Sequence, residues 1–377
     1  MPLPLNKSSL KKQKSARGDY LLLIAVVILA IVGTVFIYSA SNYSALKTYG
    51  DAFYFVKKQV IGIALGIVAM TLTSIFDYEK LKKFSIPVAV VAFVSLSLVF
   101  VPGIGVENYG AKRWIGLGGV TVQPSEIAKF SLILFSATYV SKNPEKMQSF
   151  LGILPVLIFG GCICILIIVE PNMSITVCVA LLMITMLLAG GMKIKHFFYL
   201  IIPAFLGGVV LILIEPYRLS RLAAFLNPWS NPKGEGYQLL QSLYALGSGG
   251  WFGVGLFNSR QKYAFLPFAE SDFILSVIGE EIGFLGLTCF FGLLFFIIYR
   301  GLKTASKSKD LFGFMLAIGI TMIFGIQTLV NALVVTGSIP PTGLPLPLVS
   351  SGNTSIIIFM AEMGIIFNVS KRNSLTF

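Results

Sequence analysis

One aspartate, Asp272, is the residue of this sequence best placed to do chemistry. It follows a long polar segment and stands at the start of an apolar segment long enough to cross a membrane. The polar segment carries five cations, namely Arg218, Arg221, Lys233, Arg260 and Lys262. A carboxylate at a membrane surface can act as a general base toward a hydroxyl, while cations beside it hold an anionic headgroup. The pattern therefore favours chemistry on a lipid-linked substrate.

A few other charged residues lie inside apolar segments, where charges are rare and informative. Glu126 and Lys129 are three positions apart and would share one face of a helix. Glu280 lies about two turns after Asp272 on the same predicted helix face, next to Glu281. We expect Lys129 to pair with one of these two glutamates, because pairing neutralises both charges in a low dielectric. The alternative for Lys129 and Glu280 is an ion pair that only fixes helix packing.

Several common site patterns are missing from the sequence. The cysteines all lie in apolar stretches without zinc-site spacing, and they are Cys162, Cys164, Cys178 and Cys289. The single histidine, His196, follows Lys193 and Lys195 at a helix end, so no two-histidine metal site can be built. The cations are dispersed among short loops, which indicates membrane anchoring rather than nucleic-acid binding.

The composition is that of a polytopic membrane protein. Of 377 residues, 56% are hydrophobic and 12% are charged, too few polar residues to cover a soluble domain. Ten apolar segments approach or exceed the ~20 residues that a helix needs to cross a bilayer. We therefore expect an all-α fold of about ten transmembrane helices. The segments are Tyr20–Ser39, Phe53–Phe76, Phe84–Pro102, Gln123–Val140, Phe150–Val169, Asn172–Gly190, Phe197–Glu215, Asp272–Tyr299, Leu311–Gly337 and Val349–Val369.

The predicted domain organisation is a basic tail, residues 1–19, and a single transmembrane domain, residues 20–377. The long loop 216–271 lies between the seventh and eighth spans. Its tryptophans and glycines predict amphipathic helices on the membrane surface rather than a linker. Ten spans place both termini on one side, and the short loops of that side carry the larger share of Lys and Arg. This distribution predicts that both termini are cytoplasmic.

Three segments interrupt the apolar pattern. The glycine-rich residues 247–255 lack the preceding strand and the lysine of a nucleotide-binding loop, so we expect a turn that brings backbone close to a headgroup or another helix. Residues 170–172, Glu-Pro-Asn, divide one apolar run into two helices, and we expect a tight hairpin there. The prolines of residues 340–347 exclude regular helix. Such backbone is tolerated at membrane depth only where it is buried in protein or lines a cavity.

These motifs, in this order, resemble the SEDS family of shape, elongation, division and sporulation proteins, which includes FtsW, RodA and SpoVE. The resemblance covers nearly the whole chain and is greater for the division and sporulation branch. The stretches that carry it are Gly110-Ala-Lys-Arg-Trp-Ile115, Gln123-Pro-Ser-Glu126 with Lys129, Tyr217-Arg218 with Arg221, Asn227-Pro-Trp229, Gly236-Tyr-Gln, Gln241-Ser-Leu, Gly249-Gly250, Ser259-Arg-Gln-Lys262, Asp272-Phe-Ile, Gly279-Glu-Glu and Pro341-Thr-Gly-Leu-Pro-Leu-Pro-Leu-Val-Ser350. The sequence departs from the family pattern at Phe268, Glu270, Ser271, Asn172 and Asn353.

The resemblance implies a peptidoglycan glycosyltransferase that polymerises lipid II outside the bacterial cytoplasmic membrane. The family's essential aspartate falls on Asp272. A class B penicillin-binding transpeptidase and other divisome or elongasome membrane proteins are the implied partners. The implied substrate-binding residues are Lys112, Arg113, Trp114, Gln123, Glu126, Lys129, Arg218, Arg221, Lys262 and Ser350, with Glu280 and Glu281 in a structural polar core.

The expected reaction is an inverting transfer in which Asp272 takes the proton of the acceptor's 4-hydroxyl. Charge on the departing diphosphate would be stabilised by Arg113, Arg218, Arg221 and Lys262. A divalent cation, Mg or Mn, is compatible with a diphosphate, but no cluster of ligands demands one. Two alternatives stay open. One is a transporter or flippase with a polar path through Lys129, Glu280, Glu281 and Glu362, and the other is a non-catalytic scaffold for a transpeptidase.

Overall fold

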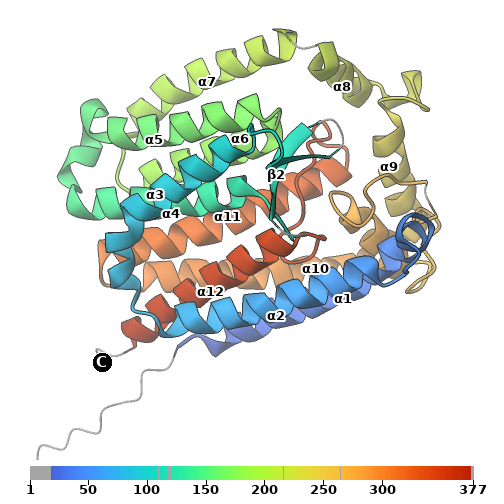
Figure 1. The fold of residues 1–377 in the computed structure, drawn as a ribbon, viewed down its shortest axis with the longest axis horizontal. Helices are drawn as coiled ribbons and strands as arrows, with labels where there is room; N and C mark the ends of the chain where they lie inside the picture. The colour runs from blue at the N-terminus through green and yellow to red at the C-terminus, as the bar shows by residue number, and fades with distance from the viewer. Residues whose placement is uncertain (1–17, 109–110, 118–119, 215, 264, 375–377) are drawn as a thin grey trace, which may run out of the picture.

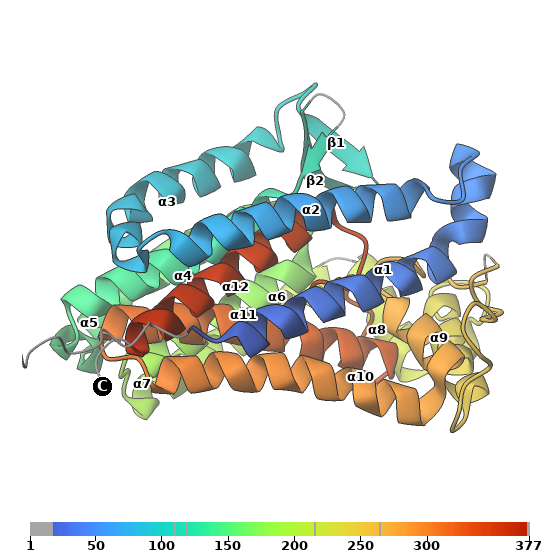
Figure 2. The same ribbon diagram turned by 90° about the horizontal axis from the view of Figure 1, so that it is seen from below.

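Ten long helices form the body of the molecule in the computed structural model, which describes residues 18–108, 111–117, 120–214, 216–263 and 265–374. They run roughly along one direction and coincide with the ten apolar segments of the sequence (Figures 1 and 2). The helices are α1 (Tyr20–Tyr49), α2 (Tyr54–Ile75), α3 (Leu81–Leu98), α4 (Pro124–Lys142), α5 (Phe150–Val169), α6 (Met173–Ala189), α7 (Ile194–Ile214), α10 (Ile274–Ser306), α11 (Leu311–Val335) and α12 (Asn353–Asn373).

The core of the bundle is built around α11, which packs against α4, α6, α10 and α12. Its Phe312 and Phe324 are almost completely enclosed. Around this centre α2 lies along α12, α3 along α4, and α5 along α6. Close packing of this kind is what associates helices in lipid, where the hydrophobic effect between them is weak.

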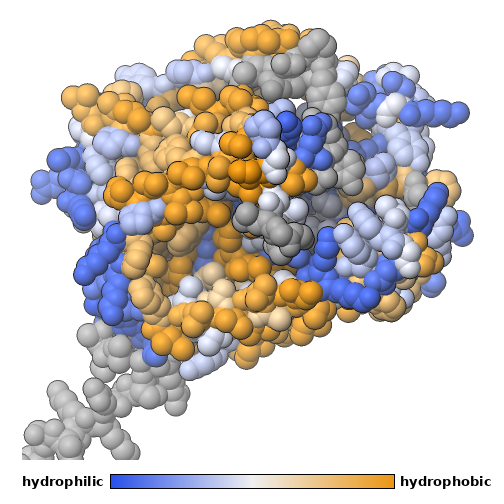
Figure 3. Space-filling view, viewed as in Figure 1, coloured by the Kyte–Doolittle hydropathy of each residue, from blue (hydrophilic) through white to orange (hydrophobic). Residues whose placement is uncertain are grey.

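The outer helices present apolar side chains to the surroundings. Leu151 on α5 is 78% exposed and Phe205 on α7 is 70% exposed. Figure 3 shows hydrophobic residues across the middle of the molecule and polar residues toward both ends. Within the described residues, seven helices are long and apolar enough to cross a membrane, and residues 173–189 and 194–210 form shorter apolar helices. The predicted class, an all-α polytopic membrane protein, is confirmed.

Both described ends of the chain lie at the same end of the bundle. The backbone N–H of Asp19 donates to Ser370 Oγ at 2.9 Å, and the Asp19 carboxylate pairs with Arg300. This contact joins the start of α1 to the end of α12. The helices α8 (Pro216–Leu226) and α9 (Tyr237–Gly249) lie at the opposite end (Figure 1), which we call the site end.

A small antiparallel sheet at the site end is absent from the sequence prediction. It consists of β1 (Gly105–Asn108), β2 (Ala111–Leu117) and β3 (Val120–Val122), in the order β1-β2-β3. Val106 pairs with Trp114, and Ile115 pairs with both Gly105 and Val122. β1 and β3 are short, and β2 does not alternate strictly between apolar and polar residues, so the sequence suggested only a loop between two spans. The sheet places Arg113 at the site end of the bundle.

A second difference lies in α10, which the sequence predicts as one continuous span from Asp272. The helix begins at Ile274 and is interrupted at Gly283, which has a φ of 67°. The glycine-rich loop fills the interruption, because the N–H of Val254 donates to Glu280 O at 3.0 Å and the N–H of Phe284 donates to Gly250 O at 2.9 Å. A Cβ on Gly253 would lie 2.1 Å from Glu281 O. The prediction that these glycines permit close backbone approach is confirmed.

The long loop contains helices, as predicted. It holds α8, a 3₁₀ turn (η3, Pro228–Ser230) and α9. Two further 3₁₀ turns, η1 (Tyr78–Lys80) and η2 (Glu145–Gln148), lie between spans. α8 packs on α7, and α9 packs along α10. The loop thus joins the two sides of the bundle across the site end.

Candidate active site

Asp272 lies in a tight turn immediately before α10. Phe268 has a φ of 57°, and its carbonyl accepts from the N–H of Ser271 at 3.0 Å and from Phe273 at 3.3 Å. Asn331 of α11 donates from Nδ2 to Asp272 O at 2.8 Å and to Leu344 O at 2.7 Å. The amide of Asn331 therefore connects this turn to the proline-rich loop, residues 340–347, and these bonds fix the position of Asp272.

Ser350 forms a second connection to the Asp272 turn. Its Oγ donates to Ser271 O at 2.7 Å and accepts from the N–H of Leu346 at 2.8 Å. Ser350 is only 4% exposed. The sequence suggested Ser350 as a substrate contact, whereas the structure uses it to connect the Asp272 turn with the segment entering α12.

The Asp272 carboxylate is half-buried and has a defined set of neighbours. Ser271 Oγ donates to its Oδ1 at 2.9 Å, and Oδ2 lies so close to Gly343 that a Cβ there would be 3.2 Å away. Burial raises the pKa of Asp272, and the Ser271 hydrogen bond and the charges of Arg113 and Arg221 oppose this rise. A carboxylate with a raised pKa and nearby cations is suited to accept a proton beside an anionic group.

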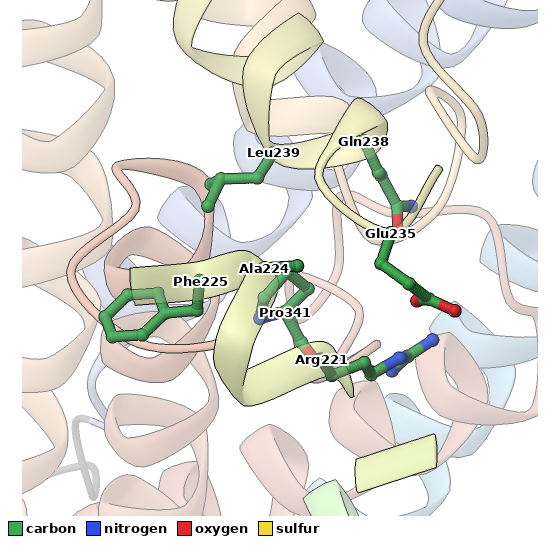
Figure 4. A pocket seen from close by; sticks show the side chains of 7 residues that line it. All are labelled: Arg221, Ala224, Phe225, Glu235, Gln238, Leu239 and Pro341. Atoms are coloured by element: carbon green, nitrogen blue, oxygen red, sulfur yellow. Dashed lines mark hydrogen bonds between the residues drawn. The ribbon is translucent and has the colours of Figure 1, made fainter. Parts of the chain in front are cut away.

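Arg221 reaches the site from α8. Its Nη1 donates to Pro341 O at 3.4 Å, which connects α8 to the proline-rich loop. It also lines a small pocket of about 30 Å³, room for roughly one water molecule. In Figure 4 the side chains of Arg221 and Glu235 point toward one another at this pocket. The other lining residues are Ala224, Phe225, Gln238, Leu239 and Pro341.

Arg113 reaches the site from β2. Its guanidinium donates to the carbonyl of Pro171, in the turn between α5 and α6. That turn is the predicted hairpin, and Asn172 caps α6 by accepting from the N–H of Ile175 at 3.4 Å. Of the neighbouring predicted residues, Lys112 is exposed and Trp114 is half-buried. Gln123 precedes the first residue of α4.

The expected pairing of Lys129 with Glu280 or Glu281 is wrong. Lys129 Nζ lies 2.7 Å from Glu126 Oε1 and 2.9 Å from Gln327 Oε1. Lys129 and Glu126 are both 2% exposed, so they are enclosed between helices, and their contact with a substrate stays a prediction. The i,i+3 spacing on α4 provides a partner on the same helix, and a distant glutamate is not needed.

Glu280 and Glu281 accept hydrogen bonds from neutral donors next to the break in α10, although Glu281 Oε2 has no hydrogen-bond partner. Glu280 accepts from the N–H of Arg260 at 3.1 Å and from the hydroxyl of Ser259. Glu281 accepts from the hydroxyl of Ser39 on α1 and from the N–H of Ser259 at 3.3 Å. These carboxylates therefore connect the long loop to the bundle.

Lys262 and Arg218 are two further cations of the long loop that were predicted to bind the substrate. Lys262 is only 3% exposed, and its ammonium donates to the carbonyl of Phe257, so its contact with the substrate stays a prediction. The side chain of Arg218 lies outside the described residues. Among the predicted cations with described side chains, Arg113 and Arg221 are the ones whose charges act on Asp272.

Reasoning from the sequence missed three parts of the site. Asn331 and Gly343 are far from Asp272 in the sequence, and no local pattern marks them. The sequence marked Glu170 only as part of the helix break at residues 170–172, where a tight hairpin was expected. Within the described residues, no group of three or more His, Cys, Asp and Glu could hold a metal ion.

A bundle of apolar helices with a carboxylate and two arginines held at one end defines a polytopic membrane protein with a candidate site for an anionic substrate. The family model described as cell cycle protein, FtsW/RodA/SpoVE, matches residues 19–375. The chain therefore belongs to the FtsW/RodA/SpoVE family, as its motifs suggested.

Relatives with assigned names support this membership. The chain is 38% identical over 355 residues to a probable peptidoglycan glycosyltransferase FtsW of Geobacter sp. strain M18, covering 94% of this chain and 97% of that protein. It is 37% identical over 359 residues to the stage V sporulation protein E of Bacillus subtilis, covering 95% and 98%. These names agree with the predicted resemblance to the division and sporulation branch.

Solved structures share the fold. A chain of a peptidoglycan synthase complex that coordinates polymerization and crosslinking has a TM-score of 0.77 and 24% identity, covering 94% of this chain and 98% of that chain. The rod shape determining protein RodA of Thermus thermophilus has a TM-score of 0.69 and 23% identity, covering 95% and 97%. At this level of identity the similarity concerns the fold alone.

Proposed function

We propose that this protein is a peptidoglycan glycosyltransferase that polymerises lipid II, with Asp272 as the general base. The observation that carries the proposal is that Asp272, held in the turn before α10, lies within electrostatic range of Arg113 and Arg221. They come from three separate elements, a turn, a strand and a helix. Membership of the FtsW/RodA/SpoVE family and the names of the relatives support the choice of substrate.

The proposed reaction is a single displacement. Asp272 takes the proton from the 4-hydroxyl of the acceptor sugar, and the oxygen attacks the anomeric carbon of the donor. The bond from that carbon to the diphosphate breaks, and polyprenyl diphosphate leaves with the electron pair. Arg113 and Arg221 stabilise its negative charge through charge-assisted hydrogen bonds. The proton then passes from Asp272 to solvent, which restores the base.

We place the site end outside the cytoplasmic membrane and both termini inside it. The support is the excess of Lys and Arg in the short loops on the terminal side. A class B penicillin-binding transpeptidase is the proposed partner, because the family resemblance implies one and a structural neighbour belongs to a complex that couples polymerization to crosslinking.

A transporter is less well supported by the arrangement of the buried charges. Lys129 and Glu126 form one cluster with Gln327, whereas Glu280 and Glu281 are bonded to Ser39, Ser259 and the long loop. The hydrogen bonds of the described residues do not connect the two clusters into one path across the membrane. Each cluster instead resembles a local packing device.

The test is the rate of glycan synthesis from lipid II by purified Asp272→Asn, with and without the transpeptidase. We expect a loss of about 100-fold or more, because the general base is removed. The stability loss should stay near 1 kcal/mol, since the carboxylate accepts one hydrogen bond, from Ser271. Asp51→Asn is the matched control, because Asp51 is at the same end of the bundle and only partly buried.

Glycan synthesis by Asp272→Asn at the wild-type rate would remove Asp272 from the chemistry. An inactive wild-type protein that still stimulates the transpeptidase would instead favour the scaffold alternative.

A further inference from the structure

Glu170 is a buried carboxylate that the proposed reaction does not use. It follows the last residue of α5 and is only 1% exposed. Neither of its oxygens has a hydrogen-bond partner. Burying a carboxylate in this way is costly, and a buried polar group without a partner calls for an explanation. Glu281 and Glu362 each have one such oxygen, whereas both oxygens of Glu170 lack a partner. Glu280, by comparison, is equally buried but accepts hydrogen bonds on both of its oxygens.

Arg113 connects Glu170 to the candidate active site. Its guanidinium is bonded to the carbonyl of Pro171, the residue next to Glu170. Burial raises the pKa of Glu170 to about 8, and the charge of Arg113 opposes this rise. The same charge opposes the raised pKa of Asp272. One guanidinium therefore acts on two carboxylates, one at the α5–α6 turn and one at the start of α10.

We propose that Glu170 is a positioning residue that competes with the anionic substrate for Arg113, so that substrate binding is coupled to uptake of one proton at Glu170. The inference rests on the proposed function, because the anion is the diphosphate of the donor. Ionised Glu170 attracts Arg113 toward the α5–α6 turn, whereas neutral Glu170 leaves the guanidinium available to the diphosphate.

The direction of the pH effect follows from this competition. Below about pH 8 Glu170 is neutral, and no buried negative charge holds Arg113 at the α5–α6 turn beside its bond to the Pro171 carbonyl. Above it Glu170 is ionised, and the substrate must draw Arg113 away from a buried negative charge. Losing that cation raises the pKa of Glu170 further, so the carboxylate takes a proton from solvent as the diphosphate binds. The KM for lipid II should therefore rise with pH.

Other charged groups near the site act on different parameters. Arg113 from β2 is the charged group that acts on Glu170 among the described residues. Asp272 shares Arg113 but touches the attacking hydroxyl, so its titration changes kcat. Arg221 acts on Asp272 from α8. Lys112, the neighbour of Arg113 on β2, is exposed to solvent.

The test is the pH dependence of kcat and of KM for lipid II in the wild type, Glu170→Gln and Glu170→Asp. For the wild type, KM should rise about five- to tenfold between about pH 7 and about pH 9 if the pKa of Glu170 moves up by one unit or more on binding. Glu170→Gln should keep the low-pH KM across the range, and Glu170→Asp should restore the rise. Glu145→Gln, an exposed carboxylate outside the site in η2, is the matched control and should behave like the wild type.

Binding of fluorescent lipid II without turnover separates this inference from the proposed function. The heat of binding, measured by calorimetric titration in two buffers of different ionisation enthalpy, should show proton uptake by the wild type near pH 8 and none by Glu170→Gln. This result would support the role of Glu170 even if no glycan were made. A KM and a proton count that are the same in Glu170→Gln and wild type would overturn it. If Glu170→Gln does not fold, a flat KM in Glu170→Asp would also overturn it.

Discussion

Replacing Lys129 with methionine tests how the buried charges of the bundle are paired. The ammonium lies 2.7 Å from Glu126 Oε1 and 2.9 Å from Gln327 Oε1, and it faces the ring of Phe359 at 5.4 Å. Glu362 on α12 also lies within electrostatic range of Lys129. The substitution keeps a long apolar side chain but removes the cation that these groups share.

The expected cost follows from the burial of the pair. Lys129→Met leaves the Glu126 carboxylate enclosed without a counter-charge, which should cost about 3–5 kcal/mol. Glu126→Gln should cost less, roughly 1.5–3 kcal/mol, because Lys129 keeps Gln327 as a partner. The double variant removes both charges together. It should therefore be more stable than the sum of the single losses predicts, by about 2 kcal/mol or more.

The measurement is a double-mutant cycle on thermal unfolding in detergent at a fixed protein concentration and scan rate. A second cycle, Lys129→Met with Glu281→Gln, serves as the comparison. Because Glu281 is bonded to Ser39 and Ser259, the second cycle should be additive within about 0.5 kcal/mol. Coupling of Lys129 to Glu281 that exceeds its coupling to Glu126 would refute the pairing described above.

Two further predictions concern the site end. Arg221→Lys should raise the KM for lipid II about tenfold despite the retained charge, because lysine lacks the planar fork that binds a diphosphate. The control is Arg260→Lys, at an exposed arginine of the same loop, which should leave the KM unchanged. Equal KM values for the two variants would remove Arg221 from the site. Gly253→Ala should lower stability by about 3 kcal/mol or more, because Gly253 has a φ of 80° and its Cβ would lie 2.1 Å from Glu281 O. Thermal unfolding checks this against Gly247→Ala, whose Cβ meets nothing within 4 Å; similar melting temperatures for the two variants would show that the loop can move away.

The sequence alone was sufficient to predict the membrane class and the number of long helices. Hydropathy is a local property, and a helix satisfies its own backbone hydrogen bonds, so each apolar segment determines one span without reference to its neighbours. The same locality identified Asp272 as a carboxylate at the start of a span. It also identified the breaks at residues 170–172 and 340–347, where proline cannot continue a helix.

The partners of the buried charges were decided by the tertiary structure. Lys129 could have paired with glutamates on α4 or α10, and only the packing of α4 against α11 and α12 provides Gln327 beside it. Glu280 and Glu281 lie beside the interruption of α10 at Gly283, where the long loop brings Ser259 within hydrogen-bond distance of both. Contacts of this kind join residues distant in sequence, so no periodicity or spacing reveals them.

The candidate site combines residue types that the sequence gives with positions that only the tertiary structure gives. The residue types of Asp272, Arg113 and Arg221 could be read from the sequence, but their meeting depends on three elements whose positions are set elsewhere. The β-sheet carries Arg113 to the α5–α6 turn, and α8 carries Arg221 to the proline-rich loop. Asn331 of α11 holds the Asp272 turn between them. The sequence determines which groups are available, and long-range packing decides which of them act on one another, because electrostatic interactions depend on distance in space and on burial.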